Sequence, residues 1–341
     1  MRESGFETAW AGKAPYLIAE IGSNHNGKLS RAKRMMRSAA SSGADAVKFQ
    51  LFTLPQLIQP ENYEKALALE SSAWRSSFRK LEFKLSWLPE LKRLADRLDV
   101  DFLCTPFDAE SLAAYTALKP AAIKIASGDI THTALLRQAA ASGIPVILST
   151  GASTTNEIEK AVAITGKEKT ALLDCVMSYP APASAYSPER LSLLRKYCRI
   201  TGVSDHTEGV ALAAEAMLGG AVVIEKHFTL NRALPGADHA HSSEPKTFAV
   251  LKSIMLETFQ LRAHGRTRPQ DGAERIYARR AVYARVPIAQ GEIFSEKNCI
   301  ALRPALENYV PASSWDDLTG KAAKKSYTGG MGIEKQEFFT H

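Results

Sequence analysis

Short apolar runs alternate with longer amphipathic segments along most of the chain. The runs are rich in β-branched residues, and most end in Gly, Ser, Asp or His. Their interiors are almost wholly apolar, as in Val146-Ile147-Leu148, which is typical of strands covered on both faces. The pattern predicts eight strands: Tyr16–Gly22, Ala46–Gln50, Asp101–Phe107, Ala122–Gly128, Pro145–Gly151, Ala171–Val176, Arg199–His206 and Ala221–Phe228.

The segments between these runs predict helices, several of which end at a glycine. The predicted helices include Leu29–Ser42, Ala109–Leu118, Thr133–Ser142, Thr155–Ile164, Pro188–Tyr197, Gly209–Gly219 and Pro245–Ala263. Eight such units form a (β/α)8 TIM barrel, whose usual size of about 250 residues agrees with a first domain over 1–265. The interval Leu51–Val100 is expected to be irregular to about Lys80 and then helical, as an active-site loop or a surface excursion.

The pattern changes after a polar linker over 266–277. Short strands and turns then predict a small, mostly-β domain over 278–341, with strands at Arg280–Arg285 and Cys299–Arg303. A domain of about sixty residues buries little apolar surface, so we expect it to lean on the barrel or on a second subunit.

Composition and charge narrow the class of protein. The 341 residues show no secretory leader and no apolar run long enough to cross a bilayer, and the four cysteines form no C-x-x-C pair. We therefore expect a cytoplasmic, reduced protein without a membrane partner. The net charge of +7 is spread over many helices and interleaved with acids. An anionic small substrate or a solubilising surface explains this charge better than nucleic acid does.

Two histidines, His206 and His227, each follow an apolar run and lie 21 residues apart, which is one strand–helix–strand step. They are expected at the carboxyl ends of neighbouring strands, where barrel enzymes keep their chemistry. Neutral imidazoles there can share one cation, with Asp205 or Glu225 orienting them, or each can be a hydrogen-bonded polar residue without a metal. The following loop, Gly236–Ser242, offers further ligands or acid–base groups, although its His-x-His is also compatible with a solvated loop.

Other polar side chains end neighbouring strands and together suit a phosphate group. They are Lys124, Ser127, Ser149 and Thr105, with Glu20, Lys48 and Gln50 on the first two strands. A buried ammonium without a partner is costly, so Lys124 should pair with an anionic ligand or simply with Glu20 or Asp129. The serines and the threonine could instead be helix caps.

Several ordered motifs resemble the sialic acid synthase family over nearly the whole chain. They are Ala19–Gly27, Thr105–Asp108, Lys124–Gly128, Leu148–Gly151, Tyr179–Pro182, Ser204–Thr207, Glu225–Leu230 and Pro235–His239. Residues from Ala278 onward resemble the family's C-terminal antifreeze-like (SAF) domain, with Arg303-Pro304 at its Arg-Pro. The resemblance implies a TIM barrel followed by a small, mostly-β SAF domain.

The resemblance also implies condensation of phosphoenolpyruvate with an open-chain N-acyl amino hexose such as N-acetylmannosamine, giving a nine-carbon 2-keto sugar acid and phosphate. It implies a divalent metal, Mn²⁺ before Mg²⁺ or Co²⁺, held by His206 and His227. It further implies a domain-swapped homodimer in which Arg303 reaches the acylamino group of the sugar from the partner subunit. The expected catalytic residues are Glu20, Lys124, His206, His227 and Asp238, and the expected substrate-binding residues are Lys48, Gln50, Thr105, Ser127, Ser149, Tyr179, Glu225 and Arg303.

Alternatives remain open at this point. Met177 stands where bacterial sialic acid synthases carry asparagine, and Leu51–Lys80 has little of the family's sequence. Related synthases of legionaminic or pseudaminic acid use a 2,4-diacetamido-trideoxy hexose in the same barrel. More remote alternatives are a metal-dependent barrel hydrolase, which usually carries His-x-His on its first strand, and a non-catalytic sugar-binding protein.

Overall fold

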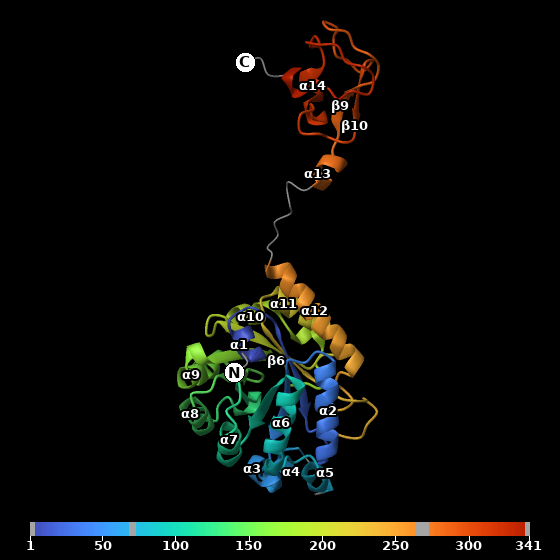
Figure 1. Ribbon diagram of the computed structural model, residues 1–341. Helices are drawn as coiled ribbons and strands as arrows, with labels where there is room; N and C mark the ends of the chain where they lie inside the picture. The colour runs from blue at the N-terminus through green and yellow to red at the C-terminus, as the bar shows by residue number, and fades with distance from the viewer. Residues whose placement is uncertain (1–3, 68–72, 264–272, 338–341) are drawn as a thin grey trace. The chain divides into compact units, whose positions relative to one another are not determined.

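The computed structural model describes residues 4–67, 73–263 and 273–337 (Figure 1). The chain divides into two compact units, Met1–Gly265 and Arg266–His341, which are considered separately here. The first part of the predicted linker, 266–272, lies outside the described residues.

The first unit is a barrel of eight parallel strands, as the sequence predicts. Hydrogen-bonded neighbours follow the order β3-β2-β1-β8-β7-β6-β5-β4, and β3 and β4 lie next to each other at the seam. The pairing of β1 with β8 brings the first and last strands together, which confirms the (β/α)8 fold. The strands are β1 (Tyr16–Gly22), β2 (Ala46–Leu51), β3 (Asp101–Pro106), β4 (Ile123–Ile125), β5 (Val146–Ser149), β6 (Thr170–Cys175), β7 (Ile200–Asp205) and β8 (Val223–His227).

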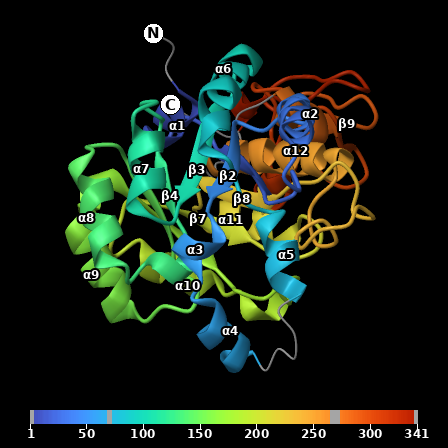
Figure 2. The same cartoon turned by 90° about the horizontal axis from the view of Figure 1, so that it is seen from below.

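Helices surround these strands (Figure 2). They are α2 (Leu29–Ser41), α6 (Leu88–Leu98), α7 (Ala109–Thr116), α8 (Thr133–Ala141), α9 (Thr155–Thr165), α10 (Pro188–Leu194), α11 (Ala211–Leu218) and α12 (Pro245–Ala263). Local capping sets several starts: the Asp108 carboxylate accepts the Ser111 N–H at 2.8 Å, and Thr154 and Glu157 form a capping box. Among the described residues, no helix combines the length and the apolar character needed to cross a membrane.

The interval after β2 differs from the sequence prediction. Instead of an irregular stretch it forms three short helices, α3 (Leu54–Leu57), α4 (Pro60–Ala66) and α5 (Ala73–Arg79), before a 3₁₀ turn leads into α6. Two of these helices have a proline in the first turn, where the missing N–H costs nothing, so the prolines begin helices here rather than break them.

Side chains along each strand alternate between two cores. On β1, Leu17, Ala19 and Ile21 pack in the layer between the strands and the helices, whereas Ile18 packs inside the barrel. Glu20, two residues further along, lies on the same inner side. The inner positions are therefore apolar toward the amino ends of the strands and polar at the carboxyl ends.

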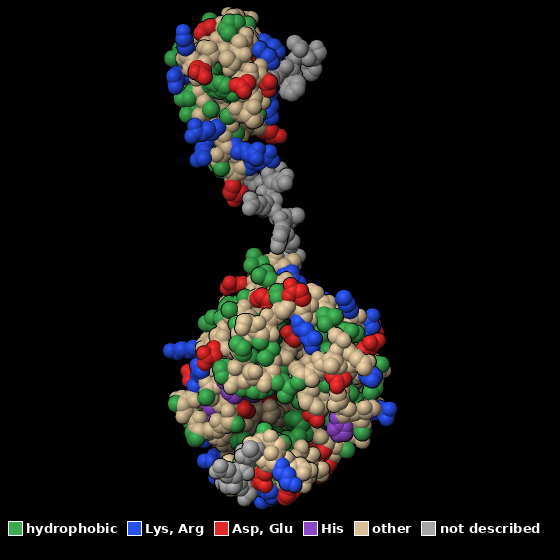
Figure 3. Space-filling view, turned by 180° about the vertical axis from the view of Figure 1, so that it is seen from behind, with side chains coloured by type: hydrophobic (Ala, Val, Ile, Leu, Met, Phe, Trp, Pro, Cys, Tyr) green, Lys and Arg blue, Asp and Glu red, His purple; other side chains and the backbone are tan. Residues whose placement is uncertain are grey.

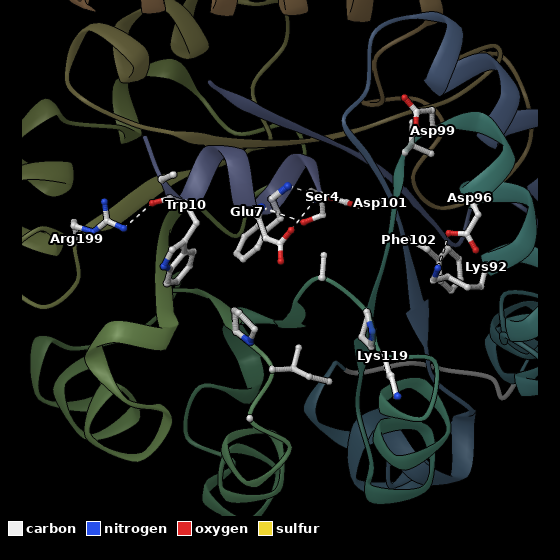
Figure 4. A pocket seen from close by; sticks show the side chains of 18 residues that line it. Ser4, Glu7, Trp10, Lys92, Asp96, Asp99, Asp101, Phe102, Lys119 and Arg199 are labelled. Atoms are coloured by element: carbon white, nitrogen blue, oxygen red, sulfur yellow. Dashed lines mark hydrogen bonds and ion pairs between the residues drawn. The ribbon is translucent and has the colours of Figure 1, made fainter. Parts of the chain in front are cut away.

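Helix α1 (Gly5–Trp10) covers the amino-terminal end of the barrel. Phe6 is buried and stacks against Tyr16, while the Asp101 carboxylate accepts hydrogen bonds from the Phe6 N–H at 3.0 Å and the Tyr16 hydroxyl at 2.8 Å. A cavity of about 880 Å³ lies beside this helix, and Figure 4 shows its lining with Glu7, Arg199 and other labelled residues. Residues at this end of a TIM barrel usually serve stability, so we expect the active site at the carboxyl-terminal end of the strands.

The second unit is small and built mainly from turns and short strands. Strands β9 (Ala281–Ala284) and β10 (Cys299–Leu302) pair antiparallel, and α14 (Trp315–Leu318) follows. Its buried core includes Val282, Phe294, Val310, Tyr327 and Ile333. One prediction needs correction. The end of the expected linker forms helix α13 (Ala273–Ala278), because Ala, Glu and Arg favour helix even in a segment that is polar as a whole.

Candidate active site

Polar side chains close the carboxyl-terminal end of the barrel around a cavity of about 100 Å³. The structure brings eleven of the predicted residues to this cavity: Glu20, Lys48, Gln50, Thr105, Lys124, Ser127, Ser149, Tyr179, His206, Glu225 and His227. Figure 3 shows one face of the barrel unit, which is hollowed and carries interspersed acidic and basic side chains. The cavity lies where TIM-barrel enzymes bind their substrates.

Asp238 also lies beside this cavity, and a glycine makes its approach possible. A Cβ at Gly22 would lie 3.1 Å from Glu20 Oε1 and 3.4 Å from both Gln50 Nε2 and Asp238 Oδ2. Gly22 has a φ of +52°, which L side chains seldom adopt. The glycine at the end of β1 thus lets the three polar side chains converge.

Lys48 is at the centre of a buried ion-pair network. Its Nζ lies 2.7 Å from Glu20 Oε2 and 3.7 Å from Glu225 Oε1, and it donates to Thr105 Oγ1 at 3.1 Å. Buried charges are stable only when they are paired, and here each of the three side chains is at most 7% exposed. Burial alone would lower the pKa of Lys48, but Glu20 and Glu225 raise it, so the ammonium stays charged.

Among the described residues, no carboxylate forms an ion pair with Lys124. The two partners that the sequence suggested, Glu20 and Asp129, do not contact it, and neutral acceptors take their place. Lys124 Nζ donates to Ser149 Oγ at 2.6 Å and to the Ile125 carbonyl at 2.9 Å. Burial lowers the pKa of this lysine, and the charge of Lys48 lowers it further, while the more distant charge of Glu225 is the largest of those that counteract the shift. An ammonium has three donors, so one N–H remains for an anionic ligand.

Ser127 lies beside Lys124 in the same cavity. Its Oγ accepts the Gly151 N–H at 3.0 Å, and its own hydroxyl proton, which also reaches the Cys175 thiol, can turn to a stronger acceptor such as an anion. Ser127, Ser149 and Lys124 together form what we call the anion cradle, one cation and two hydroxyls contributed by β4, β5 and the turn after β4. A phosphate group would complete the hydrogen bonding of this set.

His206 and His227 lie across the cavity, with ring centroids 5.6 Å apart. His206 Nδ1 lies 2.7 Å from the Val176 carbonyl, which can only accept, so Nδ1 carries the proton and Nε2 keeps a lone pair. The Tyr179 ring stacks on His206 at 4.2 Å and holds it in place. Burial lowers the pKa of both histidines to about 4, so both are neutral at pH 7.

These histidines fit the divalent cation that the sequence suggests. Metal ligands must be unprotonated nitrogens, and both imidazoles are neutral and buried. In addition, His227 Nδ1 is a buried nitrogen without a hydrogen-bond partner among the described residues. A cation would satisfy this atom.

Two residues differ from what the sequence suggests. Asp205 does not orient a histidine: it faces away from the cavity and pairs with Lys226 at 2.7 Å, since odd and even strand positions point to opposite sides. His239 is buried and turns to the Thr229 hydroxyl at 2.6 Å, whereas His241, the other histidine of this loop, lies near Asp238 beside the site.

Sequence reasoning missed Ser204, which donates to Glu225 Oε1 at 3.1 Å. Its position two residues before His206 on the same strand was the available indication, because such residues share a face. Arg303 lies in the second unit, directly after β10, and is exposed.

A sequence model of the NeuB family matches residues 35–266. The chain belongs to the NeuB family. The match covers most of the barrel, including all but the first of the eight strands. The remaining comparisons extend the likeness to proteins with named activities.

Several relatives of this NeuB-family chain are named as synthases of legionaminic acid, pseudaminic acid or N-acetylneuraminate 9-phosphate. It is 35% identical to the N,N'-diacetyllegionaminic acid synthase of Campylobacter jejuni over 92% of this chain and 97% of the relative. It is 36% identical to the N-acetylneuraminate-9-phosphate synthase of Drosophila melanogaster over 70% of this chain and 67% of the relative. The crystal structure of the N-acetylneuraminic acid synthetase from Leptospira borgpetersenii matches 76% of this chain and 89% of its own, with 35% identity and a TM-score of 0.67.

Glu20 is the carboxyl group of this site that titrates near neutrality. Burial raises its pKa, Lys48 opposes the shift, Glu225 adds to it, and the pKa reaches about 7. The Gln50 amide donates to Glu20 Oε1 at 2.8 Å. In the unfolded chain the pKa of Glu20 would be near 4.5, so between these values the folded state binds the extra proton.

Ionisation of Glu20 should therefore lower the free energy of unfolding as pH rises from about 4.5 to about 7, and Glu20→Gln should remove this decrease. The quantity to measure is the urea midpoint of Glu20→Gln minus that of the unmutated protein. This difference should be larger at pH 7.5 than at pH 5. Glu90→Gln is the control, because the Lys33 hydrogen bond lowers the pKa of Glu90 and places its titration below this window. If this difference in urea midpoint is the same at both pH values, the raised pKa of Glu20 is wrong.

Proposed function

We propose that this chain joins phosphoenolpyruvate to an open-chain N-acyl amino hexose and releases a nine-carbon 2-keto sugar acid and phosphate. The observation that carries the proposal is the arrangement of two unlike binding sets around one cavity. The anion cradle lies on and directly after β4 and at the end of β5, and the neutral histidines lie directly after β7 and at the end of β8. The activities for which relatives are named, synthesis of legionaminic, pseudaminic and N-acetylneuraminic acids and of N-acetylneuraminate 9-phosphate, agree with it.

Phosphoenolpyruvate would be held by the cationic half of the cavity. Lys124 Nζ uses two of its three N–H groups on acceptors among the described residues, and Ser127 can turn its hydroxyl proton from the weakly accepting Cys175 thiol, so both can donate to the phosphate. Thr105, whose hydroxyl accepts from Lys48, can turn its own proton to a second anionic group such as the carboxylate. These contacts fix the methylene carbon facing the histidines and bring it within bonding reach of an aldehyde.

The sugar would occupy the half of the cavity formed by β7 and β8. A divalent cation such as Mn²⁺, held by His206 and His227, would polarise the aldehyde oxygen and make its carbon electrophilic. Gln50, Asp238 and the half-exposed Tyr179 lie around this position and can hydrogen-bond the hydroxyl and acylamino groups. The side chains here are mostly uncharged or acidic, which suits a neutral polyhydroxylated substrate.

Bond formation proceeds from the methylene carbon of phosphoenolpyruvate to the aldehyde carbon, and the aldehyde oxygen takes a proton. The phosphate-bearing carbon then carries positive character until water adds to it, and loss of phosphate leaves the 2-keto acid. Glu20, whose pKa is raised to about 7 by burial, is placed to stabilise that charge or to take the proton of the water. Lys124 and Ser127 would hold the phosphate as it leaves.

Two classes of acyl sugar are compatible with this site. One is N-acetylmannosamine, and the other is a 2,4-diacetamido-trideoxy hexose of the kind that legionaminic and pseudaminic acids require. Relatives named for both outcomes share about a third of their residues with this chain. We place the reaction in the cytoplasm, which agrees with the free state of Cys104, Cys175, Cys198 and Cys299.

A phosphate-release assay tests the proposal. Phosphate should appear from phosphoenolpyruvate only when Mn²⁺ and one sugar from a panel of N-acetylmannosamine and 2,4-diacetamido hexoses are both present. Lys124→Met should lower kcat/KM for phosphoenolpyruvate by roughly a hundredfold or more, because it removes the cation of the cradle. Lys160→Met on the exposed face of α9 should leave it unchanged. Phosphate release without any sugar would indicate a hydrolase and contradict the synthase.

We further propose that the active enzyme is a domain-swapped homodimer in which the second unit of one copy completes the site of the other. The second unit has its own small core, and Arg303 is exposed there directly after β10. A guanidinium can donate to the carbonyl of an acylamino group, which would give specificity for acylated sugars.

Complementation between inactive variants tests the shared site. Arg303→Ala and Lys124→Ala subunits, each inactive alone, should regain up to about a quarter of the activity after mixing and subunit exchange, since random pairing makes half of the dimers mixed and each of these holds one intact site. Exchange is verified with two differently tagged copies. Mixed dimers that remain inactive would rule out an arginine supplied across the interface.

A further inference from the structure

Three side chains converge next to the histidine pair, at the loop that follows β8. One nitrogen each from His227 and His241 and one carboxylate oxygen from Asp238 lie within 4.8 Å of one another. His227 ends β8, and the other two residues belong to the loop over 228–244 that leads to α12. Ligand atoms around one ion are separated by roughly 3–4 Å, so small rotations of the rings would bring all three atoms into coordination.

Two of these side chains also carry a buried nitrogen that lacks a hydrogen-bond partner among the described residues. These atoms are His227 Nδ1 and His241 Nε2. The His241 side chain is only 9% exposed, and His227 is 7% exposed. A buried polar atom without a partner is unfavourable, and a cation that accepts the lone pairs of these two nitrogens would remove that cost.

The carboxylate of Asp238 is oriented by a residue from the loop that follows the neighbouring strand, β1. Ser23, in the loop after β1, donates to Asp238 Oδ2 at 2.9 Å, while Oδ1 lies 3.9 Å from His241 Nε2. The Tyr179 ring lies 5.1 Å from the His241 ring and limits how far it can turn. Such outer contacts are what fixes metal ligands in place.

We propose that His227, Asp238 and His241 bind one divalent cation, so that His241 and Asp238 are metal ligands in addition to the histidine that ends β8. The inference rests on the proposed function, because it concerns the metal of the same site. Two imidazoles and one carboxylate form a donor set that suits Mn²⁺, Fe²⁺ or Zn²⁺ and leaves coordination positions for substrate oxygens and water. His206, held by Val176 and Tyr179, lies outside this group of three but adjoins it, with its ring centroid 5.6 Å from that of His227. One of the open coordination positions is then for His206 Nε2, as in the proposed function.

Equilibrium binding of Mn²⁺ to the full chain without substrates tests this site. Free Mn²⁺ is measured by its electron paramagnetic resonance signal, and pulsed spectra count the nitrogens bound to the ion. His241→Asn should raise the Kd for Mn²⁺ by at least about tenfold and reduce the count by one nitrogen. Asp238→Asn should weaken binding similarly without changing the nitrogen count. His132→Asn, an exposed histidine at the start of α8, should change neither quantity.

The outcomes separate this inference from the proposed function. If His241→Asn binds Mn²⁺ as tightly as the unmutated chain with an unchanged nitrogen count, the three-residue site is wrong. Absence of Mn²⁺ binding by the unmutated chain would also overturn it. The synthase proposal fails on a different result, namely an unmutated chain that binds Mn²⁺ yet releases no phosphate with any sugar of the panel. Thermal unfolding of each variant without metal verifies that it is folded.

Discussion

The ion pairing of Lys48 with Glu20 and Glu225 is the interaction on which the rest of the site depends. Three charged side chains are buried inside the barrel. Their burial is tolerated only because both carboxylates lie within 4 Å of the Lys48 ammonium. The network occupies Glu20 and Glu225, so Lys124 is left with neutral partners and with a donor to spare. Burial and the charge of Glu225 raise the pKa of Glu20 to about 7, although Lys48 opposes the shift. The proposed anion binding and proton transfer thus both depend on charges that are buried in one place.

The period of two along a β-strand explains how much of this the sequence could predict. Apolar runs ending in polar residues identified all eight strands, and a closed parallel barrel then placed their ends around one cavity. Residues two apart, such as Lys48 and Gln50 or Glu225 and His227, share the inner face and were found together. The same rule sends Asp205 and Lys226 outward to pair with each other, which the sequence analysis did not apply.

Features that depend on loops and on tertiary contacts could not be predicted in the same way. Helices α3 and α4 begin at prolines that also suit turns, and local sequence does not distinguish the two. The sequence suggested an acidic residue as the partner of Lys124. In the structure Lys124 donates to Ser149 Oγ and to the Ile125 carbonyl instead, and these contacts depend on how neighbouring strands pack. His241 and His239 are adjacent members of one His-x-His, yet only loop geometry directs one to Asp238 and the other to Thr229.

The most direct test of the account is a crystal structure of the chain with Mn²⁺ and phosphoenolpyruvate, with anomalous data collected at the manganese edge. The account predicts the phosphate within hydrogen-bond distance of Lys124 Nζ and Ser127 Oγ, and the manganese peak across the cavity at the imidazole of His227. A phosphate bound outside the cavity, with Lys124 contacting only Ser149 and the Ile125 carbonyl, would contradict it. So would a manganese peak away from the histidines.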